Sequence, residues 1–256
     1  LDSEEAIDGL ASAARAAGRT VEVLVEVDLG MRRVGVATPE EATRLARQIA
    51  DSTPLQFAGV AFYPGHIRSD GPEATPSLKR VSDDLAGVCA ALDDAGLPAP
   101  TVSGGSTPTA WRSHEIAHVT EIRPGTYVYN DRATVASGVA SREDCALTVL
   151  ATVVSTAVPR EAVVDAGTKA LGREPRGGDD QFGFGEVLEH PEVVVRAMSE
   201  EHGLLDLRRS EWSPRVGDQV RIIPNHVCIV THLFDAVVVV RDGAVVDRWD
   251  TAARGR

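Results

Sequence analysis

The first half of the chain alternates between segments with a helical apolar period and short segments that are mostly apolar. Apolar side chains recur every three or four positions over residues 6–14 and 42–49, which predicts helices with one buried face. Thr38 before Pro39 is a plausible N-cap for the second helix. The segments 21–29 and 55–63 have the composition of strands buried on both faces of a parallel sheet.

The same alternation continues to about residue 122. Residues 81–92 carry one apolar helical face that ends at Gly96, a short strand at 101–102 follows, and another strand lies near 119–122. A repeated strand and helix indicates part of a (β/α)₈ barrel or a doubly wound sheet. A complete barrel takes about 250 residues. Only about half of this chain has the pattern, so either the sheet is small or its beginning is missing.

The second half has a different pattern, in which β-branched runs are separated by turns and predict a mostly β domain. A long loop rich in glycine and charge is expected at 172–185. The boundary between the domains is placed at residue 140, which gives domains 1–140 and 141–256. The predicted strands of the second domain are 147–158, 162–165, 216–223, 228–233 and 236–241.

Composition excludes several classes of partner. The net charge is −12, and the basic residues form no block along the chain. Both observations argue against a nucleic acid or an anionic membrane surface as the binding partner. No apolar run approaches the ~20 residues of a membrane helix, and the first residues lack the features of a signal peptide. A cytoplasmic protein with a small-molecule partner is expected. Three widely spaced cysteines indicate reduced thiols and no disulfide framework.

The sharpest chemical signal is the pair His226 and Cys228. In a segment predicted as a strand, residues two apart point to the same face and offer an imidazole and a thiolate to one ion. Nitrogen and sulfur together suit zinc. Two protein ligands would leave positions open for water or substrate, as a catalytic metal requires. A buried core cysteine beside a histidine at a strand end is the competing interpretation.

Polar residues also follow three predicted strands. The loop from Ser103 to Thr107 offers amides and hydroxyls to a phosphate ahead of a short helix, although an ordinary loop has the same composition. Arg33 follows one strand, and Tyr63 and His66 follow the next. All of these would lie at the carboxyl edge of the sheet, where α/β folds bind ligands.

These segments carry a resemblance to a known family. Residues 28–35 resemble the Asp-x-Gly-x-x-Arg-x-Gly segment of alanine racemase-like, fold-type III pyridoxal-phosphate enzymes. Six further segments resemble, in the same order, the D-serine dehydratase and D-threonine aldolase branch of that family. They are residues 63–66, 103–108, 123–127, 165–171, 201–203 and 224–228.

The resemblance implies an α/β plus β fold, in which the C-terminal part of a (β/α)₈ TIM-type barrel is followed by a mostly β domain with a metal site. It implies pyridoxal 5'-phosphate as cofactor and zinc as metal, with manganese or another divalent ion as the alternative. Carried over residue by residue, it assigns catalysis to Tyr63, His66 and His202, and the metal to His226 and Cys228. It assigns cofactor binding to Arg33, Tyr63, Ser103, Gly104, Gly105, Ser106, Thr107, Arg123 and Tyr129.

One departure from the family is serious. The family's Schiff-base lysine lies upstream of the segment that matches Leu1, and the only lysines here are Lys79 and Lys169. Neither has the position of the cofactor lysine, so both are interpreted as surface or structural residues. The expectation is that an N-terminal part of the enzyme is absent from this chain.

The implied activity is that of a lyase acting on small D-β-hydroxy amino acids. The histidine and cysteine pair favours a D-serine dehydratase that forms pyruvate and ammonia, with zinc assisting departure of the hydroxyl. An aldolase of the D-threonine type is associated with an oxygen ligand at the second position, and an amino-acid racemase would not need the metal. A non-catalytic fragment that binds phosphate and metal is the remaining hypothesis. The resemblance also implies a homodimer.

Overall fold

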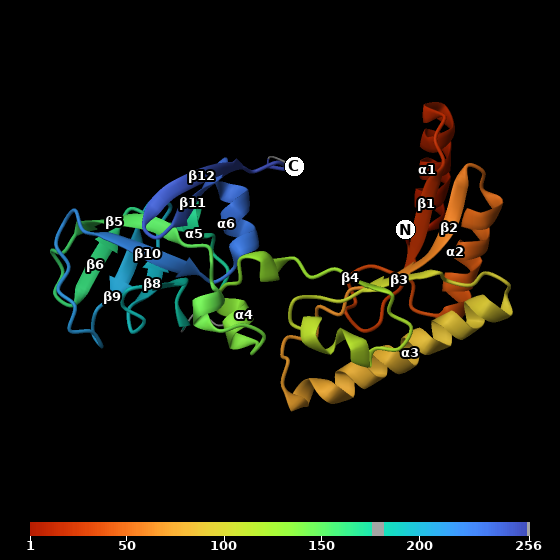
Figure 1. Ribbon diagram of the computed structural model, residues 1–256, viewed down its shortest axis with the longest axis horizontal. Helices are drawn as coiled ribbons and strands as arrows, with labels where there is room; N and C mark the ends of the chain where they lie inside the picture. The colour runs from red at the N-terminus through yellow and green to blue at the C-terminus, as the bar shows by residue number, and fades with distance from the viewer. Residues whose placement is uncertain (176–181, 255–256) are drawn as a thin grey trace. The chain divides into compact units, whose positions relative to one another are not determined.

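The computed structural model describes residues 1–175 and 182–254, which form two compact units (Figure 1). Unit 1 comprises Leu1–Gly125 and Ser137–Val139. Unit 2 comprises Thr126–Ala136 and Ala140–Arg256. The segment Thr126–Ala136, which the sequence placed before the boundary at residue 140, thus packs with the second unit.

Unit 1 is a four-stranded parallel sheet with the strand order β1-β2-β3-β4. Its helices alternate with its strands along the chain, beginning with a helix, as the sequence pattern predicts. Short 3-10 helices occupy Pro72–Ala74 and Ala110–Glu115. The elements are α1 (Glu4–Ala17), β1 (Val21–Glu26), α2 (Pro39–Asp51), β2 (Leu55–Ala61), α3 (Thr75–Asp94), β3 (Thr101–Gly104) and β4 (Glu121–Ile122).

Local sequence explains the helix starts in unit 1. Ser3 caps α1 by accepting a hydrogen bond from the amide of Ala6. Thr38 caps α2 in a capping box with Glu41, next to Pro39 at the start of the helix, as predicted. The predicted apolar faces of α2 and α3 are buried, and they join the sheet in one hydrophobic core.

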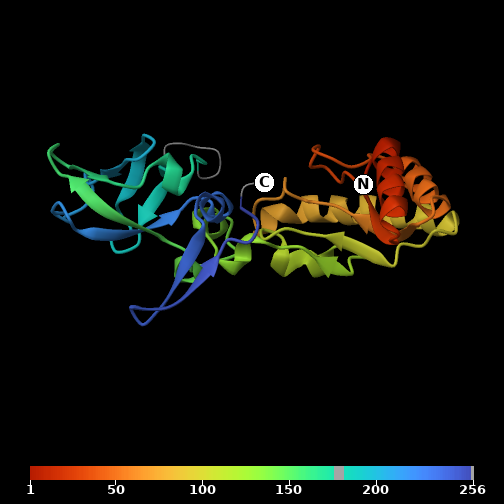
Figure 2. The same cartoon turned by 90° about the horizontal axis from the view of Figure 1, so that it is seen from above.

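Unit 2 is built around a closed β barrel with the strand order β10-β5-β6-β9-β8-β7. A separate hairpin of β11 and β12 extends from it, and Figure 2 shows this hairpin clearly. The barrel strands are β5 (Val149–Ser155), β6 (Glu161–Val164), β7 (Gly185–Val187), β8 (Val194–Met198), β9 (Gly203–Asp206) and β10 (Gln219–Pro224). The other elements are α4 (Arg132–Ala136), α5 (Thr168–Leu171), α6 (Val227–Leu233), β11 (Ala236–Arg241) and β12 (Ala244–Asp250).

The predicted strand at 228–233 is wrong, because this segment is helix α6 and the preceding strand ends at Pro224. The run of β-branched residues favoured a strand. Two contacts instead satisfy helical backbone groups: the buried carboxylate of Asp131 accepts the amide of Val227, and the hydroxyl of Thr231 donates to the carbonyl of Val227. Tertiary contacts therefore override the local preference. His226 and Cys228 flank a strand-to-helix turn and do not share a strand face.

The sequence analysis also did not predict the strands β7, β8, β9 and β12. Of the expected polar loop at 172–185, residues 176–181 lie outside the described residues. Within the described part of the chain, every helix is too short or too polar to cross a lipid bilayer.

Candidate active site

The loops that follow β1 and β2 contact each other at the carboxyl edge of the unit 1 sheet. The guanidinium carbon of Arg33 lies 4.6 Å from the ring centroid of Tyr63, in a cation–π contact. A Cβ atom placed on Gly30 would lie 3.2 Å from Nε2 of His66, so the imidazole lies directly over this glycine. Arg33, Tyr63 and His66, all predicted site residues, thus lie on adjoining loops.

Two titratable groups at this edge have shifted pKa values. Burial is the first cause that lowers the pKa of His66, and it outweighs the opposing effect of the Asp28 carboxylate. Burial opposes the shift at Asp28, but hydrogen bonds from the amides of Arg32 and Gly30 hold the pKa of that carboxyl below its usual range. Both shifts act in the same sense, favouring the neutral form of His66 and the ionised form of Asp28.

The segment from Ser103 to Thr107 is buried throughout. Gly104 packs against the ring of Phe62 so closely that a Cβ atom there would lie 2.1 Å from a ring carbon. Gly105 has φ +111°, a conformation that favours glycine. The two glycines therefore allow the chain to turn tightly over the end of β2.

The polar groups of this loop fit an anion such as a phosphate. Ser106 and Thr107 are only 4% and 6% exposed, so their hydroxyls lie in a protected environment. Not every group is available, because the Ser103 hydroxyl donates to the Glu121 carboxylate over 2.5 Å and the Ser106 amide donates to Thr109 Oγ1 over 3.0 Å. The Ser106 hydroxyl also lies 3.2 Å from Thr109 Oγ1. A buried loop with this concentration of amides and hydroxyls has the donor chemistry that a phosphate group requires.

The structure places three other predicted cofactor or catalytic residues as follows. Arg123 lies beside this edge, where its Nη2 donates to the carbonyl of Phe62 over 2.9 Å. Tyr129 belongs to unit 2, where it is partly buried against the barrel core. His202 also belongs to unit 2 and is exposed in the turn between β8 and β9.

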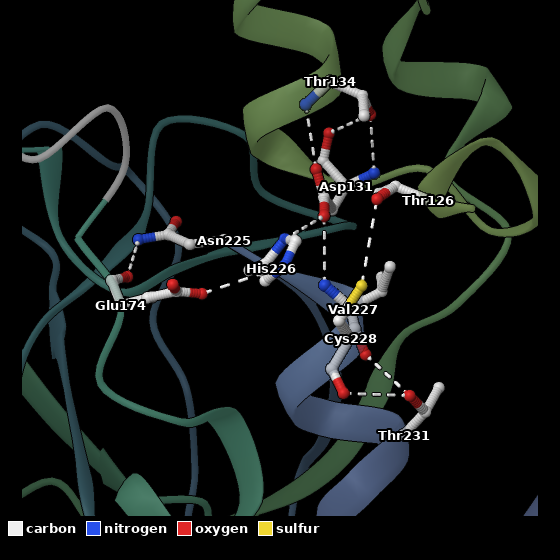
Figure 3. A network of polar contacts seen from close by, with 9 residues as sticks. All are labelled: Thr126, Asp131, Thr134, Glu174, Asn225, His226, Val227, Cys228 and Thr231. Carbon is white, nitrogen blue, oxygen red and sulfur yellow. Dashed lines mark hydrogen bonds and ion pairs between the residues drawn. The ribbon is translucent and has the colours of Figure 1, made fainter. Parts of the chain in front are cut away.

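The two predicted metal ligands lie at the turn between β10 and α6 in unit 2 (Figure 3). His226 is the residue before the helix, with 32% of its side chain exposed, and Cys228 is exposed. His226 Nδ1 lies 3.1 Å from Oδ2 of Asp131, and Cys228 Sγ lies 3.8 Å from Oγ1 of Thr126. Both ligand side chains are accessible and are supported from unit 2 itself.

The electrostatics of this turn favour a thiolate. A hydrogen bond to Asp131, followed by one to Cys228, raises the pKa of His226 to about 10. The hydrogen bond with His226 is in turn the first cause that lowers the pKa of the Cys228 thiol. A thiolate beside an imidazole is a donor pair that suits zinc, so the residues fit the implied metal. Among the described residues, no group of three or more His, Cys, Asp and Glu side chains could hold a metal.

The sequence analysis did not identify Asp131, which supports the turn that carries His226 and Cys228. It lies 95 residues before His226 in the chain, within a segment whose local pattern gives no metal signal. Only the fold of unit 2 brings the two residues together.

Comparison with known families divides the chain into two parts. The alanine racemase N-terminal domain matches residues 1–133, and the putative serine dehydratase domain matches residues 146–240. The predicted α/β plus β fold, with a TIM-type barrel part and a following β domain, is thereby confirmed.

Two characterised relatives are similar over nearly the whole chain. The D-threo-3-hydroxyaspartate dehydratase of Delftia sp. (strain HT23) is 34% identical over 98% of this chain and 70% of its own length. The D-threonine aldolase of Arthrobacter sp. is 31% identical over 100% of this chain and 66% of its own length. The chain thus spans about two thirds of the length of these relatives.

A solved structure of the same dehydratase is also similar. Its variant with one cysteine replaced by alanine, in the metal-free form, has a TM-score of 0.88 and 33% identity, and the match covers 100% of this chain and 72% of that one. A second variant has a histidine replaced by alanine two positions before that cysteine. The same spacing separates His226 from Cys228.

Proposed function

We propose that this protein is a zinc-dependent lyase that converts D-serine to pyruvate and ammonia. The premise is that the chain belongs to the D-serine dehydratase and D-threonine aldolase family of alanine racemase-like, fold-type III pyridoxal-phosphate enzymes. The observation that carries the proposal is the turn between β10 and α6, which places the accessible side chains of His226 and Cys228 two residues apart at the start of the helix. The matching spacing of the substituted histidine and cysteine in the dehydratase relative supports it.

The chemistry divides between the bound groups and the protein. When bound, pyridoxal phosphate spreads the negative charge left at Cα, and zinc acts as a Lewis acid on the departing hydroxyl. The chain's own residues would bind and orient these groups: Arg33 and Tyr63 at the sheet edge would hold the cofactor ring, and the buried loop at 103–107 would hold the phosphate. The imidazole of His66, whose pKa is lowered by burial, would act at this edge as a proton acceptor.

The proposal requires a lysine that these 256 residues do not offer. Lys79 forms an exposed ion pair with Asp83 over 2.5 Å. Lys169 is 61% exposed and pairs with Glu201 over 2.7 Å. Both lysines are therefore held at the surface by carboxylates, as predicted. The activity is proposed for a protein that carries a cofactor lysine in addition to these residues.

Aldol cleavage of D-threonine is the second candidate, because the aldolase relative is 31% identical over the whole chain. The two reactions break different bonds. Elimination breaks the bond from Cβ to oxygen and gives a 2-oxo acid and ammonia, whereas aldol cleavage breaks the bond between Cα and Cβ and gives glycine and an aldehyde. Product analysis therefore separates the two candidates.

The test begins with the protein as cells produce it. Its intact mass and zinc content are measured, and its absorbance is recorded after addition of pyridoxal phosphate. It is then incubated separately with D-serine, D-threonine and D-threo-3-hydroxyaspartate. The expected result is pyruvate and ammonia from D-serine, with activity lost in Cys228→Ala and retained in Cys89→Ala, which alters a buried cysteine on α3.

Two other results contradict the proposal. Glycine formed from D-threonine, without pyruvate from D-serine, would identify an aldolase. A mass of 27.1 kDa, without cofactor absorbance or turnover, would identify a non-catalytic chain that binds phosphate and metal.

A further inference from the structure

Asp131 lies just before helix α4, and its carboxylate contacts the turn that carries His226 and Cys228. The residue is fully buried, with 0% exposure. We propose that Asp131 is the positioning residue of the metal site, which fixes the ring of His226 so that Nε2 is the nitrogen that binds the ion. This inference rests on the proposed metal site and adds to it a residue that never touches the ion.

Both carboxylate oxygens of Asp131 are held by donors. Oδ1 accepts the amide of Thr134 over 2.8 Å. Oδ2 accepts the amide of Val227 over 3.0 Å and lies 3.1 Å from Nδ1 of His226 (Figure 3). The backbone of Asp131 is fixed as well, because its amide donates to Thr134 Oγ1 over 2.8 Å and its carbonyl accepts that hydroxyl over 2.9 Å. The carboxylate therefore has little freedom to rotate.

This arrangement determines which nitrogen of His226 carries hydrogen. An ionised carboxylate only accepts hydrogen bonds, so the imidazole must donate through Nδ1–H. In a neutral imidazole the lone pair then lies on Nε2, which is the nitrogen left for a metal. A carboxylate on the far nitrogen of a metal-bound histidine fixes both its tautomer and its ring orientation.

The same oxygen also fixes the second ligand. By accepting the amide of Val227, Asp131 satisfies one of the free donors at the start of α6 and so sets where the helix begins. Cys228 is the next residue, and its carbonyl and that of Val227 both accept the hydroxyl of Thr231 over 3.1 Å. One buried carboxylate thus determines the orientation of the imidazole and the helical position that bears the thiolate.

Asp131→Asn tests the inference with little change in shape. An asparagine has one acceptor oxygen, so its amide group must face either Thr134 or the Val227 and His226 donors, and each of these is an N–H group. We expect zinc affinity, measured by competition with a chromophoric chelator, to fall about 10-fold to 100-fold. Substitution by cobalt provides a second readout, since the d–d absorbance of bound cobalt should change with ligand geometry in this variant.

Thr134→Val is the matched control. It removes the hydroxyl that bonds to the Asp131 backbone but keeps the amide that bonds to Oδ1. It should lower the thermal midpoint while leaving zinc affinity within about twofold of the original. A purely structural role for Asp131 would instead predict zinc affinities that follow thermal stability in both variants.

A measurement on the unaltered, zinc-loaded protein remains decisive if Asp131→Asn does not fold. Nitrogen-15 shifts of the His226 ring should show a protonated Nδ1 and a zinc-bound Nε2, and zinc bound at Nδ1 would overturn the inference. Zinc affinity unchanged in Asp131→Asn would also overturn it, while the proposed metal site would stand. Zinc uptake that survives Cys228→Ala unchanged would instead overturn the proposed metal site itself.

Discussion

The three cysteines of the metal-free protein should differ sharply in their reaction with iodoacetamide. Cys228 is exposed, and its hydrogen bond with His226 lowers the pKa of its thiol. Burial raises the pKa of Cys145 to about 11 and also raises that of Cys89. Because the thiolate is the reacting form, Cys228 should be labelled first.

The magnitude follows from ionisation. At about pH 8, a thiol with a pKa of about 11 is ~0.1% thiolate, whereas one at the reference value of 9.0 is ~10% thiolate, a ratio of about 100. The less basic thiolate is intrinsically slower by about tenfold over two pKa units. Ionisation alone therefore predicts that Cys228 reacts at least about 10-fold faster than Cys145, and the burial of Cys145 increases this ratio.

The assay is peptide mapping by mass spectrometry after timed labelling of protein stripped of metal by a chelator. Saturating zinc should slow Cys228 selectively, because a coordinated thiolate is no longer free to react. Labelling in urea provides the control, since all three cysteines should then react at similar rates. Equal rates for Cys228 and Cys145 in the folded protein would refute the electrostatic argument, and a lack of zinc protection would refute coordination by Cys228.

Three further perturbations test the fold around the site. Gly59→Ala should destabilise unit 1 by more than about 3 kcal/mol in urea unfolding, because Gly59 has φ +134° and a Cβ there would lie 1.9 Å from a carbonyl oxygen of β3; an unchanged midpoint would contradict this. Asp206→Asn should lower the free energy of unfolding by about 1 kcal/mol at neutral pH, because the exposed Arg208 lowers the pKa of Asp206 to about 2. The difference between the two proteins should be complete above about pH 4 and should disappear as the pH falls through about 2. A difference in unfolding free energy that grows in acid would contradict the argument. Gly104→Ala should displace the ring of Phe62 and weaken binding of pyridoxal phosphate, followed by absorbance, more than Phe62→Leu does. Unchanged binding in Gly104→Ala would show that the loop tolerates a Cβ.

Local signals were sufficient for much of unit 1. Thr38 and Pro39 marked the start of α2, and the apolar periods of α2 and α3 gave their buried faces, because capping and burial depend on nearby residues. The position of Arg33 and Tyr63 after the first two strands followed from the βα alternation, whereas the order of the strands in the sheet was not predicted. In these helices and loops the local sequence pattern and the fold agree.

Unit 2 was harder to predict, because its key contacts join distant segments. The pair His226 and Cys228 was found from residue type and spacing, but a strand was inferred where the structure has a helix. The reason is Asp131, whose carboxylate holds the amide of Val227 from 96 residues away. No local period or turn signal carries that information, so neither the helix nor its supporting carboxylate could be predicted from the sequence.

The position of the ligand pair at a strand-to-helix turn bears on metal preference. Cys228 is exposed and is not among the buried residues of the barrel core. Exchange of the proposed second ligand for an oxygen donor would therefore alter metal preference without a folding penalty from the core. One exposed position would then tune the proposed metal site, while the buried carboxylate behind it preserves the site's shape.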